Sequence, residues 1–180
     1  WHQDGAYFGL EPKNMATAWV ALYDAPFEAG CMQAVSFHGA PKVLHHAALR
    51  MEHSINRAGQ TIVGDISEDG IETMALKAGE FSVHHELAIH RSGENNAGHR
   101  RVGIGLNYIP THVRTTGPVK MTAMLVRGRD DYGHFDLIDP PTAERDEAAL
   151  ATHRLVGERY RDNYNAMVAR HEAEFGTAAE

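Results

Sequence analysis

The sequence predicts a mainly-β fold, a sandwich or barrel-like jelly roll, followed by one amphipathic α-helix near the C-terminal end. Short runs rich in β-branched and aromatic residues follow one another closely, separated by turns that contain Gly and Pro. From Thr142 onward Ala, Glu and Arg dominate, with apolar residues at helical spacing. A length of 180 residues suits one domain. We therefore expect a single domain over 1–180, with a jelly-roll core over 1–139 and a helix over 142–175.

The β-rich part divides into runs that each have the length and composition of a strand. The expected strands are 14–24, 31–37, 71–76, 81–84, 87–90, 101–109 and 120–126. The first two flank a turn at 26–30 and form a hairpin-like pair. Residues 37–69 are polar and His-rich with several Gly and Pro breakers, so we expect a long functional loop, either a lid or an insertion.

The C-terminal helix is indicated by a single apolar stripe. Its members are Leu150, Leu155, Val156, Tyr160, Tyr164, Met167 and Val168. Pro140, Pro141 and Thr142 give a start signal and Gly176 a stop signal. We expect the apolar face to pack on the sheet or on a partner subunit, which would make a homo-oligomer.

Composition excludes several classes of protein. The net charge of −7 argues against a nucleic-acid surface, and no run of about 18 apolar residues predicts a membrane span. Cys31 stands alone, so no intrachain disulfide forms and a reducing compartment, the cytoplasm, is expected. No basic-then-apolar leader is visible in a chain that starts at Trp1.

The segment His2-Gln3-Asp4 contains an H-x-D pair. Two residues apart on a β-strand, His2 and Asp4 would project from the same face. With a second imidazole from another strand, they would form a 2-His-1-carboxylate face that leaves positions open on non-haem Fe(II). Alone, an H-x-D pair is common, and an exposed pair at a strand end without metal is the default interpretation.

Three segments raise this interpretation above the default. They are WHQDGAYF at 1–8, TAWVALYDAPFEAGCMQAV at 17–35, and LKAGEFSVHHELAIHRSGENNAGHRRVGIGLNYIPTHVR at 76–114. In their order and motifs they resemble the phytanoyl-CoA dioxygenase family of Fe(II)/2-oxoglutarate oxygenases. The resemblance implies a double-stranded β-helix, the cupin-like jelly roll. It also implies Fe(II) held by His2, Asp4 and His90, with 2-oxoglutarate and O2 as cosubstrates.

The same resemblance assigns a cosubstrate site. Arg101, eleven residues after His90, would form the salt bridge to the distal carboxylate of 2-oxoglutarate. A guanidinium suits this role because it matches a carboxylate bidentately and stays charged. Ser92 would share the face of His90 and donate to the same carboxylate. Arg100 alternates to the other face, and a slip of one residue between Arg100 and Arg101 is the open alternative.

Further residues are candidates for a substrate pocket. Tyr7 and Phe8 lie close to His2 in the sequence, although core packing is their more common role. Arg91 stands where the family usually has Gly after the distal histidine. His85 is expected to line the pocket or orient a ligand, whereas His84 shares strand parity with His90 and competes with it as a ligand.

The activity implied by the resemblance is hydroxylation of a small-molecule C–H bond, with release of succinate and CO2. Related halogenases have a small residue in place of Asp4, so the carboxylate favours hydroxylation. Family members normally carry a segment before the H-x-D pair, so we expect the N-terminal part of the domain to be missing. Two alternatives stay open: a cupin-like metal oxygenase that does not use 2-oxoglutarate, and a non-enzymatic jelly-roll binding domain.

Overall fold

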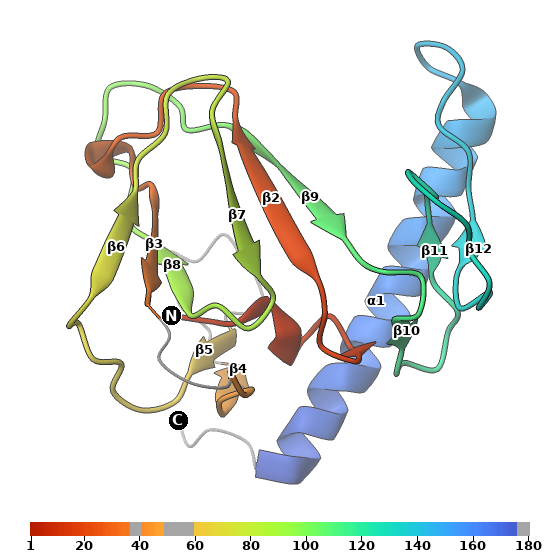
Figure 1. Ribbon diagram of the computed structural model, residues 1–180, viewed down its shortest axis with the longest axis horizontal. Coiled ribbons are helices and arrows are strands. Elements are labelled where there is room, and N and C mark those ends of the chain that lie inside the picture. Colours follow the sequence, from red (N-terminus) through yellow and green to blue (C-terminus); the bar gives the residue numbers. More distant parts are fainter. Residues whose placement is uncertain (37–40, 49–59, 176–180) are drawn as a thin grey trace. The chain divides into compact units, whose positions relative to one another are not determined.

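The computed structural model describes residues 1–36, 41–48 and 60–175 (Figure 1). Within these residues the chain forms two compact units. The first contains Trp1–Ala6 and Met15–Ile109, and the second contains Tyr7–Asn14 and residues 110–175. The single domain expected over 1–180 stays a prediction.

The first unit is built on two three-stranded antiparallel sheets, in the orders β7-β2-β9 and β6-β3-β8. A third, two-stranded sheet pairs β4 with β5. Figure 1 shows β2 and β3 as the central strands of their sheets. The elements are β2 (Ala16–Ala21), the 3-10 helix η2 (Phe27–Ala29), β3 (Met32–Val35), β4 (His46–Ala48), β5 (Gln60–Ile62), β6 (Ile71–Met74), β7 (Phe81–His85), β8 (His90–Ser92) and β9 (Gly103–Tyr108). The predicted mainly-β jelly-roll class is confirmed.

Most expected strands are shorter in the structure, and the largest differences near the candidate ligands are at β8 and in the long loop. The strand expected at 87–90 is β8, and it begins only at His90. Residues after β7 form a turn instead of continuing as a strand, because the Ala88 N–H donates to the His85 carbonyl at 2.9 Å. Inside the long loop expected at 37–69, β4 and β5 were not predicted. The loop residues 37–40 and 49–59 lie outside the described residues.

The second unit contains two small sheets and one helix. The pairs are β1 (Leu10–Glu11) with β10 (Arg114–Thr115), antiparallel, and β11 (Thr122–Ala123) with β12 (Asp136–Leu137), parallel. The strand expected at 120–126 is therefore reduced to β11. The predicted C-terminal helix is confirmed as α1 (Glu147–Phe175). None of the described helices combines the length and apolar character needed to cross a membrane.

Helix α1 begins later than the Pro-Pro-Thr signal predicted, because its cap is Asp146. The Asp146 carboxylate accepts hydrogen bonds from the N–H groups of Ala148 and Ala149, at 3.0 and 3.2 Å. These are donors that the first turn of a helix leaves unsatisfied. Thr142 instead lies outside the helix and donates to the same carboxylate.

Polar contacts attach α1 to the rest of the second unit. Asn163 exchanges two hydrogen bonds with the Val119 backbone, at 2.9 and 2.7 Å. Arg159 binds Asp136 at 2.7 Å and the Lys120 carbonyl at 3.1 Å. Such directional bonds fix the rotation of the helix about its axis more narrowly than an apolar stripe would. A homo-oligomer through α1 stays a prediction.

In the first unit, the Trp19 side chain on the β7-β2-β9 sheet fits only because the neighbouring strand has a glycine beside it. Trp19 on β2 lies opposite Gly105, and Gly103 lies two residues along β9 on the same face. A Cβ atom at Gly103 would overlap the six-membered ring of Trp19, whereas a Cβ at Gly105 would have nothing within 4 Å. Gly103 therefore makes room for the indole.

We expect G103A to lower the free energy of unfolding by about 1–3 kcal/mol, the usual cost of overpacking a well-packed site. The added methyl group would displace the Trp19 indole. Chemical denaturation monitored by tryptophan fluorescence measures the change. G105A on the same strand is the matched control and should leave stability unchanged or slightly higher, because Ala loses less backbone entropy than Gly. Equal effects of the two substitutions would contradict the assignment.

Candidate metal centre

The H-x-D segment is held against β8 by one isolated antiparallel bridge. The His2 N–H donates to the His90 carbonyl and the His90 N–H donates to the His2 carbonyl, both at 3.0 Å. This reciprocal pair fixes the two histidines directly opposite each other. The two histidines that the sequence suggested as iron ligands thus meet through the backbone.

Asp4 departs from the strand geometry that the sequence predicted. It begins the 3-10 helix η1 (Asp4–Ala6), and the Gly5 N–H donates to the Glu86 carbonyl at 2.8 Å. A Cβ at Gly5 would lie 2.9 Å from Leu87 Cδ2, so glycine permits this close approach. Asp4 therefore reaches the site through a turn, not through the period-two alternation of a strand.

Gln3, between the two candidate ligands, is completely buried and connects three segments. Its amide Nε2 donates to the carbonyls of Leu87 and Lys42, at 2.8 and 3.0 Å, and its Oε1 accepts from the Leu44 N–H at 2.8 Å. Its backbone N–H donates to His46 Nε2 at 3.0 Å. These bonds hold the backbone of the H-x-D segment in place.

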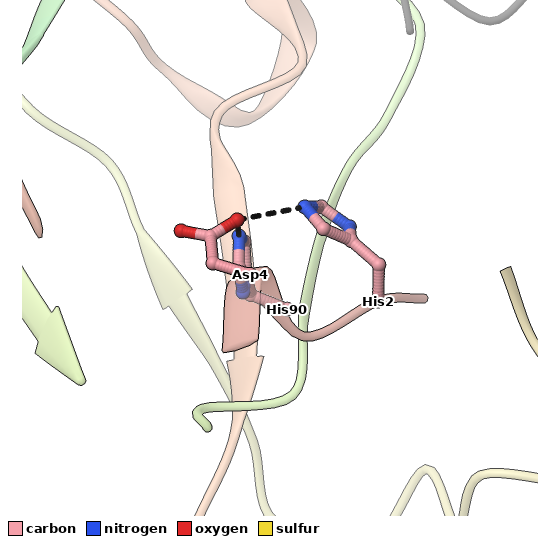
Figure 2. Close-up of side chains that lie close together, drawn as sticks. All are labelled: His2, Asp4 and His90. Carbon is pink, nitrogen blue, oxygen red and sulfur yellow. Dashed lines mark ion pairs between the residues drawn. The ribbon is translucent and has the colours of Figure 1, made fainter. Parts of the chain in front are cut away.

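The side chains of His2, Asp4 and His90 converge on one point (Figure 2). Asp4 Oδ1 lies 3.7 Å from His2 Nε2 and 3.8 Å from His90 Nε2. One ligand atom from each residue lies within 4.8 Å of the other two. These separations exceed hydrogen-bond length, and a single metal ion bonded to all three groups would lie between them. Two imidazoles and one carboxylate leave three positions of an octahedral metal open.

The protonation of the two histidines suits metal binding. Burial, followed by the neighbouring His90, lowers the pKa of His2 to about 3. Burial also lowers the pKa of His90. Neutral imidazole is the form that binds metals. His90 Nδ1 donates to the Ala88 carbonyl at 2.9 Å, since a carbonyl oxygen only accepts, and so Nε2 keeps its lone pair facing Asp4.

The second oxygen of Asp4 has different neighbours, which the sequence did not predict. Asp4 Oδ2 lies 3.5 Å from His84 Nε2 on β7 and 3.4 Å from Thr17 Oγ1 on β2. Thr17 also donates to Asn107 Oδ1 at 2.9 Å. Thr17 pairs with His84 on one side and with Asn107 on the other, so the three residues form a row across the sheet. Strand parity had placed His84 on the face of His90 as a competing ligand, but it gave no sign of the contacts of His84 and Thr17 with Asp4.

Arg101, the residue suggested as the cosubstrate anchor, lies over Trp19. Its guanidinium carbon is 5.3 Å from the centre of the ring. Burial lowers the pKa of Arg101, and among the described residues it forms no ion pair. Arg100 is exposed, whereas Arg101 is half-buried. Ser92 pairs with Met32 on β3, two residues beyond His90 on β8.

His85 and Arg91 are two of the residues that the sequence suggested for a substrate pocket. His85 is exposed and lies on the opposite face of β7 from His84, because side chains alternate along a strand. Arg91 likewise points away from the face of His90: its guanidinium stacks on Trp1 at 4.2 Å and donates to Gln33 at 3.0 Å. Neither side chain shares the strand face of His84 or His90, and the role of His85 and Arg91 in a substrate pocket stays a prediction.

Tyr7 and Phe8 belong to the second unit. There the two rings lie 5.6 Å apart, and Phe8 packs edge-on against Tyr160 at 6.4 Å. Their suggested role in a substrate pocket stays a prediction.

Comparison with known families supplies the identification. The family model described as phytanoyl-CoA dioxygenase (PhyH) matches residues 1–103, which include all three converging side chains and Arg101. The chain belongs to the phytanoyl-CoA dioxygenase family. The predicted family is thereby confirmed. A search of curated proteins gave no significant match.

Solved structures support the fold of this family member. ThoJ, a non-haem monooxygenase in its apo form, is 32% identical with a TM-score of 0.81, over 94% of this chain and 61% of that one. The ThoJ–Ni complex is 30% identical with a TM-score of 0.71, over 93% and 59% of the two chains. EvdO2 from Micromonospora carbonacea var. aurantiaca is 25% identical with a TM-score of 0.50, over 59% and 43%. The chain thus spans about three fifths of the length of ThoJ.

We expect Q3A to lower the free energy of unfolding by about 2–4 kcal/mol, because it leaves three backbone groups of two segments, 42–44 and 87, without their hydrogen-bond partner. The affected partners are the Leu87 and Lys42 carbonyls and the Leu44 N–H. Urea denaturation followed by circular dichroism measures the loss. Q33A is the matched control, since the half-buried side chain of Gln33 forms hydrogen bonds only with the side chains of Arg91 and Thr73 among the described residues, and it should cost less than about 1 kcal/mol. A neutral Q3A would contradict the role given to Gln3.

Proposed function

We propose that this chain is the metal-binding part of an Fe(II)- and 2-oxoglutarate-dependent dioxygenase that hydroxylates a C–H bond of a small molecule. The observation that carries the proposal is the convergence of His2, Asp4 and His90 on one point in a member of this family. ThoJ, which is 32% identical, is a non-haem monooxygenase and supports the same class of chemistry.

The residues present fit an iron ion by their donor chemistry. His2 Nε2, His90 Nε2 and Asp4 Oδ1 would hold it, with both imidazoles neutral and the His90 lone pair directed inward. The ThoJ–Ni complex shows a divalent first-row metal in a protein 30% identical to this chain. When bound, iron would supply oxygen activation coupled to the oxidative decarboxylation of 2-oxoglutarate to succinate and CO2.

Within the chain, Arg101 would bind the distal carboxylate of 2-oxoglutarate. Its half-buried guanidinium lacks an ion-pair partner among the described residues and is oriented by the face of Trp19. Stacking leaves the edge of the guanidinium, with its N–H donors, free to bind a carboxylate bidentately. Ser92, at the exposed end of β8, would add a hydroxyl donor. Gly103 contributes indirectly, since it makes the space in which Trp19 lies.

The outcome proposed for the substrate is hydroxylation. Asp4 would hold the metal with its carboxylate, where related halogenases keep a small residue and leave room for chloride. The net charge of −7 favours a small molecule over a nucleic acid as the substrate.

Anaerobic titration tests the proposal. We expect the chain to bind one Fe(II), and we expect 2-oxoglutarate to add a metal-to-ligand charge-transfer band in the visible absorption spectrum. R101A should weaken 2-oxoglutarate binding by roughly 10–100-fold and leave Fe(II) binding unchanged, because a charge-assisted bond to a carboxylate contributes about 1.5–3 kcal/mol.

R100A is the matched control for this titration, since Arg100 is the exposed neighbour. It should bind 2-oxoglutarate like the wild type. An R101A variant with unchanged 2-oxoglutarate affinity would remove Arg101 from the proposal. Fe(II) binding without any response to 2-oxoglutarate, and without succinate in air, would favour a metal-binding domain of another function.

A further inference from the structure

We propose that His84 is a positioning residue, which donates a hydrogen bond to Asp4 Oδ2 and so keeps Asp4 bound to the metal through Oδ1 alone. The inference rests on the proposed function and extends it to a residue that binds neither metal nor cosubstrate. A carboxylate that binds through one oxygen would leave one more coordination position of the metal for other ligands than a carboxylate that binds through two.

The two oxygens of Asp4 face different groups. Oδ1 lies 3.7 and 3.8 Å from the Nε2 atoms of His2 and His90, the other two candidate ligands. Oδ2 lies 3.5 Å from His84 Nε2 and 3.4 Å from Thr17 Oγ1, which both belong to the β7-β2-β9 sheet. The carboxylate therefore has one side toward the metal ligands and one side toward the sheet.

Thr17 has a better acceptor than Asp4. A hydroxyl carries one proton, and that of Thr17 lies 2.9 Å from Asn107 Oδ1, against 3.4 Å from Asp4 Oδ2. The shorter contact takes the proton, because hydrogen bonds between oxygens weaken beyond about 3.0 Å. That leaves the His84 imidazole, rather than the threonine, to donate to Oδ2.

His84 is itself a buried group that needs a partner. Its side chain is 7% exposed, and neither ring nitrogen has a hydrogen-bond partner among the described residues. A buried polar group without a hydrogen bond is costly. Pairing of Thr17 with His84 between β2 and β7 places this imidazole beside the carboxylate, so a small approach of Nε2 to Oδ2 would give Nε2 a hydrogen-bond acceptor.

The consequence is a carboxylate restricted to one metal-binding oxygen. A proton donated to Oδ2 competes with the metal for its lone pairs and fixes the orientation of the carboxylate plane. The three protein donors would then leave the remaining positions of a bound metal to the 2-oxo acid and dioxygen. Without the donor, Oδ2 can rotate toward the metal and occupy one of these positions.

The test compares H84F, H84Q and H85F in the full 180-residue chain, titrated with Co(II) under anaerobic conditions. Phe keeps a ring without a donor, and Gln keeps a donor at a similar reach from the backbone. We expect H84F to weaken Co(II) binding by about 10–100-fold, the usual effect of removing a partner of a metal ligand. It should also change the intensity of the visible Co(II) absorption, which reports coordination number.

H84Q should restore most of the affinity and the wild-type spectrum. H85F, on the outer face of the same strand, is the matched control and should bind like the wild type. Circular dichroism melting confirms folding, and H84L replaces H84F in the comparison if the latter does not fold. Equal losses in H84F and H84Q would show that the ring volume matters and not the donor, which overturns the proposal.

Two further results would also overturn it. One is an H84F variant with wild-type affinity and spectrum. The other is three coordinated imidazoles in the wild type, counted by pulsed EPR on the Cu(II) form, which would make His84 a ligand. A wild-type chain that binds no metal removes the proposed function together with this inference, whereas metal binding with an unaffected H84F removes the inference alone.

Discussion

One reciprocal pair of backbone hydrogen bonds, between His2 and His90, determines the geometry of the candidate site. The two N–H···O bonds of 3.0 Å place the histidines opposite each other, although 87 residues separate them in the sequence. In an antiparallel bridge the side chains of such a pair project to the same side. The 3-10 turn at Asp4 then brings the carboxylate to the same point.

Buried polar contacts support this bridge from both sides. Gln3 satisfies backbone groups of the segments around Lys42, Leu44 and Leu87 and so prevents the H-x-D segment from shifting. On the side of the sheet, Thr17 and His84 flank the second oxygen of Asp4. Because buried polar groups are costly when unpaired, these contacts define one arrangement of the site instead of several.

The sequence predicted the parts of the structure that depend on local pattern and on recognisable motifs. The composition of 14–24, the alternation of 101–109 and the helical stripe of the tail led to the fold class, and the segments around His2 and His90 led to the family. It could not predict contacts that depend on long-range register. In the sequence, Gln3 is an ordinary polar residue within H-x-D. Its burial depends on hydrogen bonds to residues 39 and 84 positions away. Strand parity alone made His84 a competitor of His90 as a ligand, and only the regular pairing of β7 with β2 shows that His84 lies beside Asp4 while His85 turns outward.

The central claim is that His2, Asp4 and His90 together hold one metal ion. Anomalous diffraction at the iron absorption edge, from crystals of the chain grown anaerobically with Fe(II), tests it most directly. The account predicts a single strong peak within bonding distance of His2 Nε2, His90 Nε2 and Asp4 Oδ1. A peak bonded to other side chains, or no peak in crystals that contain the ordered chain, would contradict it.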